Sequence, residues 1–152
     1  MRPVAYRFGR GWRTARDHQY SIRMRVGEAV EDLPLTVRRT HHGPIVGRDN
    51  GRPLAIRLSR LEEGGWFDQW YAMSKASSLA SFRRALRRGA IAYMNVVYAD
   101  RAGNIYYVYN GAIPRRRAGV DFRAPVDGSD PSNEWRGQHL LRDLPQILNP
   151  DA

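Results

Sequence analysis

Hydrophobic and charged residues alternate along the first third of the chain, and this pattern predicts antiparallel β-strands with one apolar face. We interpret residues 6–40 as a β meander, in which the alternation is clearest at 20–26. A second strand is predicted at 33–39, with Leu35 and Val37 on one face.

The second strand contains Pro34, which places it at a sheet edge or at the start of a strand. Two shorter strands are then predicted at 45–46 and 54–58. Between them, residues 48–51 favour a hairpin turn, because the pair Asn50-Gly51 tolerates positive φ angles.

One amphipathic helix is clearly predicted in the middle of the chain. Ser77 or Ser78 can cap its start, and Gly89 ends it. Its apolar stripe has the helical spacings of three and four residues: Leu79, Phe82 and Leu86. The aromatic-rich residues 66–73 fit a second helix, but they fit a strand or a loop as well.

The strongest hairpin signal lies at residues 96–109. Residues 96–99 and 105–109 are rich in β-branched and aromatic side chains, and residues 100–103 supply the turn. After residue 109, glycine and proline recur too often for long elements, and no closing strand or helix is predicted. The whole pattern predicts an α+β fold with mostly antiparallel strands and one clear helix.

The composition is that of one globular domain. The chain has 152 residues, of which 42% are hydrophobic, and this is enough for a single core. No apolar run approaches the roughly 20 residues of a membrane helix, and the first residues lack the apolar region of a signal peptide. Cysteine is absent, which excludes disulfides, thiolate metal sites and a cysteine nucleophile.

The chain is strongly basic, with a formal net charge of +10. Such a charge can indicate binding to nucleic acid or to an anionic membrane. However, Lys75 is the only lysine, whereas surfaces that bind phosphate normally use lysine as well as arginine. We therefore favour a coding bias toward arginine, and we expect neither nucleic acid nor a membrane as a partner.

His41 and His42 are the only neighbouring imidazoles. Adjacent residues of a strand point to opposite faces, so we expect that the two histidines do not readily bind one metal ion. The nearest carboxylate, Asp49, lies across a predicted turn. Structural hydrogen bonding is the favoured interpretation of the pair, and catalysis or metal binding is the alternative.

No other pattern in the sequence forms a complete active site. The carboxylates lack a recognisable acid–base spacing, and none of the eight serines lies in a Gly-x-Ser-x-Gly motif. Asp100 lies in a predicted turn, where aspartate is expected for backbone reasons alone. Four aromatic residues near the helix are interpreted as core packing, with a ligand pocket as the alternative: Trp66, Trp70, Tyr71 and Tyr93.

Several segments, taken in chain order, resemble the β-chain of penicillin-acylase-type amidases, which are N-terminal nucleophile hydrolases. The first matching segment is Arg39-Thr40-His41-His42-Gly43-Pro44-Ile45, and no single segment is diagnostic without the others. The other matching positions are Trp70 and the segments 78–86, 95–100, 103–107, 111–115, 135–137, 144–145 and 149–150. The ordered set covers most of residues 36–150.

The resemblance implies an αββα sandwich and hydrolysis of linear amides such as penicillins or acyl-homoserine lactones. In this family, the nucleophile is the hydroxyl of a serine at the start of the β-chain, and its own α-amino group is the base. An α-amine, with a pKa near 8, can accept that proton at neutral pH. Backbone N–H groups and an asparagine side chain stabilise the oxyanion.

By this resemblance, residues 1–152 are expected to be a partial β-chain domain, truncated at both ends and without a catalytic residue. The partners would then be the remaining segments of the acylase precursor and a small acylated amide substrate. A periplasmic or secreted location is implied for the parent enzyme.

Three positions take an implied role from the resemblance. Trp70 and Met94 match places where the family lines its acyl pocket, and Phe122 matches a backbone carbonyl that helps to hold a structural calcium in some members. The other calcium ligands are expected outside this chain, so we predict neither a metal nor another cofactor here. Two alternatives remain: a free-standing basic β-rich module that binds nucleic acid or anionic surfaces, and a subunit that docks with separately encoded parts.

Overall fold

A computed structural model describes residues 4–60 and 62–150 of the chain. The chain divides into two compact units, which we describe separately. The first unit comprises the residues up to Arg57 together with 117–134, and the second comprises 58–116 together with the residues from Trp135 onward.

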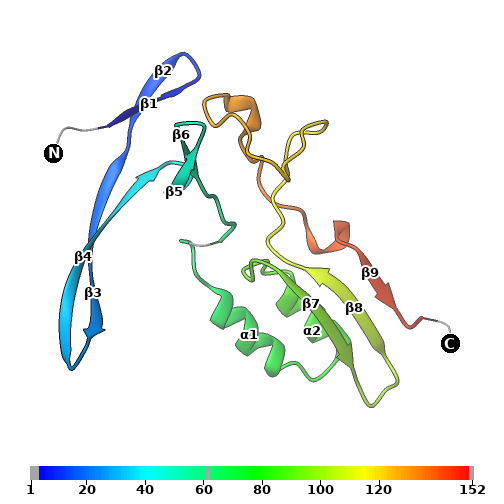
Figure 1. The fold of residues 1–152 in the computed structure, drawn as a ribbon. Helices are drawn as coiled ribbons and strands as arrows, with labels where there is room; N and C mark the ends of the chain where they lie inside the picture. The colour runs from blue at the N-terminus through cyan, green and yellow to red at the C-terminus, as the bar shows by residue number, and fades with distance from the viewer. Residues whose placement is uncertain (1–3, 61, 151–152) are drawn as a thin grey trace. The chain divides into compact units, whose positions relative to one another are not determined.

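The first unit is built from antiparallel strands (Figure 1). A small hairpin pairs β1 (Ala5–Phe8) with β2 (Gly11–Thr14). A four-stranded sheet follows in chain order: β3 (Arg16–Val26), β4 (Ala29–Thr40), β5 (Gly43–Asp49) and β6 (Arg52–Ala55). A short 3₁₀ turn, η1 (Pro131–Asn133), lies in the later segment of this unit.

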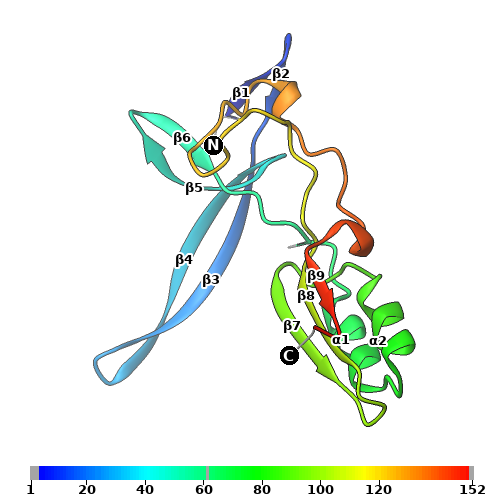
Figure 2. The same ribbon diagram turned by 90° about the vertical axis from the view of Figure 1, so that its right-hand side faces the viewer.

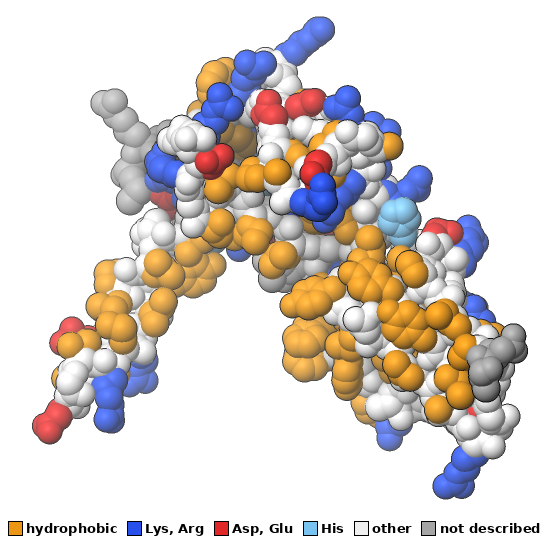
Figure 3. Space-filling view, turned by 45° about the vertical axis from the view of Figure 1, so that its right-hand side comes forward, with side chains coloured by type: hydrophobic (Ala, Val, Ile, Leu, Met, Phe, Trp, Pro, Cys, Tyr) orange, Lys and Arg blue, Asp and Glu red, His pale blue; other side chains and the backbone are white. Residues whose placement is uncertain are grey.

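The β3–β4 hairpin has one apolar and one polar face, as the sequence alternation predicts. Ile22 lies opposite Leu33, and three further residues on the same face are also apolar and exposed: Tyr20, Met24 and Leu35. On the other face, Arg38 forms a bidentate ion pair with Asp17, at 2.7 and 2.8 Å. Figure 3 shows hydrophobic side chains gathered along this hairpin.

The chain turns sharply between β4 and β5, at the residues His41 and His42. Gly43 then has a φ of +127°, and a Cβ at this position would lie 2.1 Å from the carbonyl oxygen of Ile56. The backbones pack this closely because the N–H of Ile56 donates to the carbonyl of Pro44 at 3.0 Å. Only glycine fits this turn, which explains its place in the motif.

The second unit packs two helices against a three-stranded antiparallel sheet. The helices are α1 (Trp66–Ser74) and α2 (Leu79–Leu86), and the strands are β7 (Met94–Ala99), β8 (Ile105–Asn110) and β9 (Gln146–Leu148), with a 3₁₀ turn, η2 (Leu141–Asp143). Both helices lie on one face of the sheet (Figure 2). The buried core comprises Phe82, Leu86, Val96, Tyr106, Val108 and Leu144.

Local sequence signals account for α2. Ser78 caps its first turn by accepting the N–H of Ser81, whose own hydroxyl accepts the N–H of Ser78. Phe82 and Leu86 are buried on the inner face, while Gly89 ends the helix with a φ of +55°. These features confirm the predicted helix, and the paired strands β7 and β8 confirm the predicted hairpin.

The predicted α+β class with mostly antiparallel strands is confirmed, with one correction. The aromatic segment at 66–73, for which helix, strand and loop were all left open, forms helix α1, so the described residues contain two α-helices. The prediction that no closing element follows residue 109 was wrong, because β9 pairs with β8 through Leu148 and Tyr106 and the residues beside them. Within the described residues, no helix is long and apolar enough to cross a membrane.

Candidate functional site

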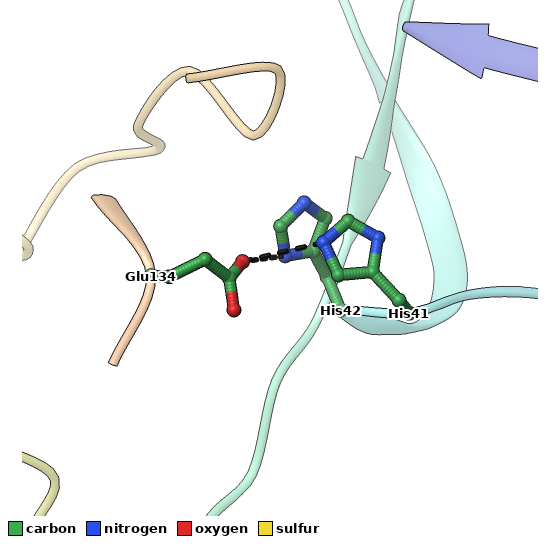
Figure 4. A group of neighbouring side chains, drawn as sticks. All are labelled: His41, His42 and Glu134. Atoms are coloured by element: carbon green, nitrogen blue, oxygen red, sulfur yellow. Dashed lines mark hydrogen bonds and ion pairs between the residues drawn. The ribbon is translucent and has the colours of Figure 1, made fainter. Parts of the chain in front are cut away.

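The first unit gathers two imidazoles and one carboxylate (Figure 4). His41 and His42 come from the turn between β4 and β5, whereas Glu134 follows η1. The Oε1 atom of Glu134 lies 3.3 Å from Nε2 of His41 and 3.2 Å from Nδ1 of His42. All three side chains are partly buried, so this group is only partly screened by water.

Tyr6 orients the ring of His41. The Tyr6 hydroxyl lies 2.8 Å from Nδ1 of His41 and accepts the backbone N–H of the same residue at 3.0 Å. The rings of Tyr6 and His41 are stacked, and the ring of Phe8 contacts the imidazole edge-on. His41 is therefore held by contacts with β1, which directs its Nε2 atom toward Glu134.

Gly128 orients the ring of His42. The Nε2 atom of His42 lies 2.8 Å from the carbonyl oxygen of Gly128. Because a carbonyl only accepts hydrogen bonds, Nε2 carries the proton and donates it. In the neutral imidazole, Nδ1 is then an unprotonated acceptor, and it is this atom that faces Glu134.

Glu134 is anchored by Arg57, whose Nη1 donates to Oε2 at 2.7 Å. Partial burial raises the pKa of Glu134, but the hydrogen bond and charge of Arg57, together with the two imidazoles, outweigh this effect and lower the pKa below 4.5. Glu134 is therefore a carboxylate at neutral pH, with Oε1 turned to the histidines.

The pKa of His41 is lowered below 6.5, chiefly because burial disfavours the charged ring. The charges of His42 and Arg13 lower it further, while Glu134 offsets part of the shift. His41 is therefore neutral at neutral pH, which is the form that can offer a lone pair.

This geometry corrects the expectation that His41 and His42 point to opposite faces. Both residues lie in a turn rather than in a strand, and their ring centroids are 3.7 Å apart. The carboxylate beside them is Glu134, not Asp49. Sequence inspection missed Glu134 because it lies 93 residues from His41, with no local motif.

The positions predicted for the acyl pocket lie in the second unit. Trp70 is on α1 with about half of its surface exposed (48%), and Met94, at the start of β7, packs against the buried core. The interpretation of the nearby aromatic residues as core packing was wrong, because all four are exposed: Trp66, Trp70, Tyr71 and Tyr93. Their exposure leaves the ligand-pocket alternative in place.

Phe122 lies in a turn of the first unit, where the residues present do not build a calcium site. Calcium takes six to eight oxygen ligands, and the neighbouring Asp121 is already paired with Arg123 at 2.9 Å. Within 4–60 and 62–150, the one group of three convergent metal-type ligands is His41, His42 and Glu134. A calcium ion at Phe122 would therefore need ligands from outside the described residues.

The sheets and helices define an α+β protein, and comparison with known proteins identifies its family. A family model described as penicillin amidase matches residues 2–152. The chain belongs to the penicillin amidase family. It is 30% identical to penicillin G acylase of Escherichia coli over 99% of its length, and 27% identical to the acyl-homoserine lactone acylase QuiP of Pseudomonas syringae pv. tomato over 88%.

A solved structure supports the same assignment. The thermostable penicillin G acylase from Alcaligenes faecalis, in its orthorhombic form, matches 96% of the chain with a TM-score of 0.81 and 32% identity. The chain spans 18% of the E. coli relative and 26% of the solved chain. It therefore corresponds to a limited part of these longer proteins.

Proposed function

We propose that this chain is part of an amidase that hydrolyses the linear amide bond of an acylated small molecule, of the penicillin or acyl-homoserine lactone type. The family match over residues 2–152 carries this proposal. The relatives that support it are named as acylases of both kinds, so the proposal leaves both acyl classes as substrates.

In this proposal the nucleophilic serine and the oxyanion asparagine are supplied by residues outside this sequence. The chain spans only 18% of the E. coli relative, which leaves room for those residues in the longer protein. In the described part of the chain, Ser78 and Ser132 form hydrogen bonds in a helix cap and a turn, and Ser59 accepts one from Gln138.

The role of this chain is then to build part of the sheet and of the acyl pocket. We propose that Trp70 and Met94 line that pocket, as the resemblance implies. The exposed face of Trp70 offers a flat apolar surface, and the thioether of Met94 adapts to the shape of an acyl group. The remaining precursor segments would supply the other pocket residues, and a periplasmic or secreted location stays a prediction.

The first test is an activity comparison. The coding region on either side of this chain is sequenced, and the chain is expressed alone and together with the flanking segments. We expect turnover of a chromogenic phenylacetyl or long-chain acyl amide only when the flanking segments are present. Turnover by residues 1–152 alone would contradict the external nucleophile, because a complete site would then lie within this chain.

The second test concerns the pocket. In the active protein, Trp70→Ala should lower kcat/KM for an acyl amide by about 10- to 200-fold, the usual cost of losing one apolar contact in a pocket. Trp12→Ala, at an exposed tryptophan on β2, is the matched control. Equal effects of the two substitutions would contradict a pocket role for Trp70.

Family membership favours this function over a free-standing basic binding module. The module alternative makes a distinct prediction, namely that the chain binds DNA, RNA or anionic lipid with an affinity that falls steeply as salt rises. A third arrangement, in which separately encoded segments dock with this chain, predicts amidase activity after mixing.

A further inference from the structure

We propose that His41, His42 and Glu134 form a binding site for a divalent transition-metal ion, with zinc as the best match. The three side chains each offer one ligand atom, and these atoms lie within 4.8 Å of one another. Nε2 of His41 and Nδ1 of His42 are the ring atoms that face Oε1 of Glu134. Two imidazoles and one carboxylate are a common zinc ligand set with one open position. Calcium and magnesium, by contrast, prefer oxygen ligands.

The two distances from Glu134 to the histidine nitrogens suit a tetrahedral ion. Zinc has bonds of about 2.0–2.1 Å to nitrogen and oxygen, so neighbouring corners of its tetrahedron lie about 3.3 Å apart. The measured separations from Oε1 of Glu134 are 3.3 Å to His41 and 3.2 Å to His42. A zinc ion bound between these three atoms would therefore need little change in the two distances from Glu134 to the histidines.

Each histidine already has the outer hydrogen bond that a metal ligand normally has. Such a ligand usually donates its second ring N–H to a carbonyl, a carboxylate or a comparable acceptor, which fixes the ring. His42 donates to the carbonyl of Gly128 at 2.8 Å, and the hydroxyl of Tyr6 lies 2.8 Å from Nδ1 of His41. A carboxylate only accepts, so without a metal ion Nε2 of His41 donates its proton to Glu134 at 3.3 Å. On metal binding this proton would move to Nδ1 and be donated to the Tyr6 hydroxyl, which leaves the lone pairs of His41 Nε2 and His42 Nδ1 for the ion.

The contact between His42 and Glu134 would be stabilised by a positive charge, because both facing atoms are hydrogen-bond acceptors. Since Nε2 of His42 donates to Gly128, the neutral ring presents a lone pair at Nδ1, and this lone pair faces the acceptor Oε1 at 3.2 Å. Two acceptors at this distance repel each other. A bound cation removes the conflict, and so does a doubly protonated His42, so the experiment must separate the two.

Of the two carboxylate oxygens of Glu134, only Oε1 is available to the ion. Arg57 occupies Oε2 of Glu134 at 2.7 Å, which keeps the carboxylate in place and makes it a one-oxygen ligand. The guanidinium charges of Arg57 and Arg13 act against a cation, while the anionic Glu134 favours it. We therefore expect an ion that joins the turn between β4 and β5 to the segment after η1, with the fourth position open to water.

The test uses purified, metal-free protein and two probes, Co²⁺ and Zn²⁺. We expect one equivalent of Co²⁺ to give the visible absorption of a tetrahedral site, and one equivalent of Zn²⁺ to remove it. Glu134→Gln and His42→Ala should each weaken zinc binding by more than about 100-fold, and Tyr6→Phe by about 10- to 100-fold, as for other outer-shell partners. His18→Ala, at an exposed histidine of β3, should leave binding unchanged.

A second measurement needs no variant and so does not depend on variant folding. X-ray absorption of the zinc-loaded protein should show nitrogen and oxygen neighbours at about 2.0–2.1 Å with the outer-shell scattering of imidazole. Absence of stoichiometric binding, a fully hydrated ion, or unchanged affinity in both ligand variants would overturn the site and leave an ion pair of protonated His42 with Glu134. None of these results depends on amidase activity, so failure of the metal site is distinct from failure of the proposed function.

Discussion

Gly128 and His42 are fitted to each other in two ways. The carbonyl of Gly128 accepts the Nε2–H of His42 at 2.8 Å, and a Cβ added to Gly128 would lie 3.0 Å from the same nitrogen. The absence of a side chain at residue 128 therefore lets the imidazole approach the backbone and fixes the direction in which its other nitrogen points.

This relationship predicts the effect of Gly128→Ala. The new methyl group should push the His42 ring away and lower the free energy of unfolding by about 1–3 kcal/mol, as overpacking does elsewhere. Chemical denaturation measures this change, and the ring ¹⁵N shifts of His42 report the lost hydrogen bond. Gly47→Ala is the matched control, because a Cβ there meets nothing within 4 Å. Equal losses at both positions would contradict the fitted contact.

Much of the fold could be predicted because its signals are local. The alternation of apolar and charged residues around Ile22 predicts strand β3, which the structure pairs with β4. The serine cap and the apolar stripe that follows it predict helix α2. The strand β9 was missed because it has only three residues and gains its hydrogen bonds from β8, about 40 residues earlier. Helix α1 stayed ambiguous because its buried anchor, Gln69, bonds to residues outside the helix.

The candidate site shows the same limit more sharply. His41 and His42 could be singled out because they are adjacent, but their relative direction depends on a turn that only glycine at 43 permits. Glu134 has no distinguishing neighbour in the sequence, and it reaches the histidines only because residues 117–134 fold back into the first unit. Long-range contacts of this kind leave no periodic signal.

The buried amide of Gln69 anchors α1 and leads to a stability prediction. Its Oε1 atom accepts the backbone N–H of Ala90 at 2.7 Å and that of Ile91 at 3.3 Å. Gln69→Leu keeps the apolar volume but leaves two buried donors without an acceptor, so it should cost about 2–4 kcal/mol of unfolding free energy. Gln19→Leu, at an exposed position on β3, should change stability by less than about 0.5 kcal/mol.

Hydrogen exchange gives a more local check of the same contact. The amides of Ala90 and Ile91 should exchange faster in Gln69→Leu, while amides in the first unit keep their rates. Unchanged protection at residues 90 and 91 would show that the anchor is not required.

Asp100 organises the turn between β7 and β8, and it makes this hairpin sensitive to acid. Hydrogen bonds from the side chain and backbone of Asn104, together with those of Tyr98 and Ala102, lower the pKa of Asp100 below 3.8 despite some desolvation. A carboxyl group whose pKa is lower in the folded state stabilises it at pH values above the unfolded pKa. That contribution is lost as the pH falls through the folded pKa.

The prediction is therefore that Asp100→Asn destabilises the protein most at neutral pH. The difference in unfolding free energy between Asp100→Asn and the parent should shrink as the pH falls below 3.8 and through the lowered pKa of the folded state, because the parent carboxylate then becomes protonated. Denaturation at a series of pH values measures the difference, with Asp32→Asn on the exposed part of β4 as the comparison. A difference that stays constant with pH would contradict a charged turn.

The exposed apolar face of the β3–β4 hairpin is expected to contact a partner of this chain. Ile22 and Leu33 lie opposite each other, 50% and 37% exposed, and an exposed patch of this kind normally marks an interface. Since the chain spans 18% of its E. coli relative, we expect the face to be covered by the remaining segments of the acylase polypeptide.

The corresponding substitutions should weaken association both of the isolated chain and of the longer polypeptide. Ile22→Gln together with Leu33→Gln should reduce self-association of the isolated chain, because each replacement removes about 1.5–3 kcal/mol of apolar burial from a contact. In the polypeptide that includes the flanking segments, the same pair should lower the yield of assembled enzyme. Light scattering and size-exclusion chromatography measure both effects, and Ser21→Gln on the polar face of β3 is the control. If the paired substitutions leave assembly intact while Ser21→Gln disrupts it, the polar face is the one that docks.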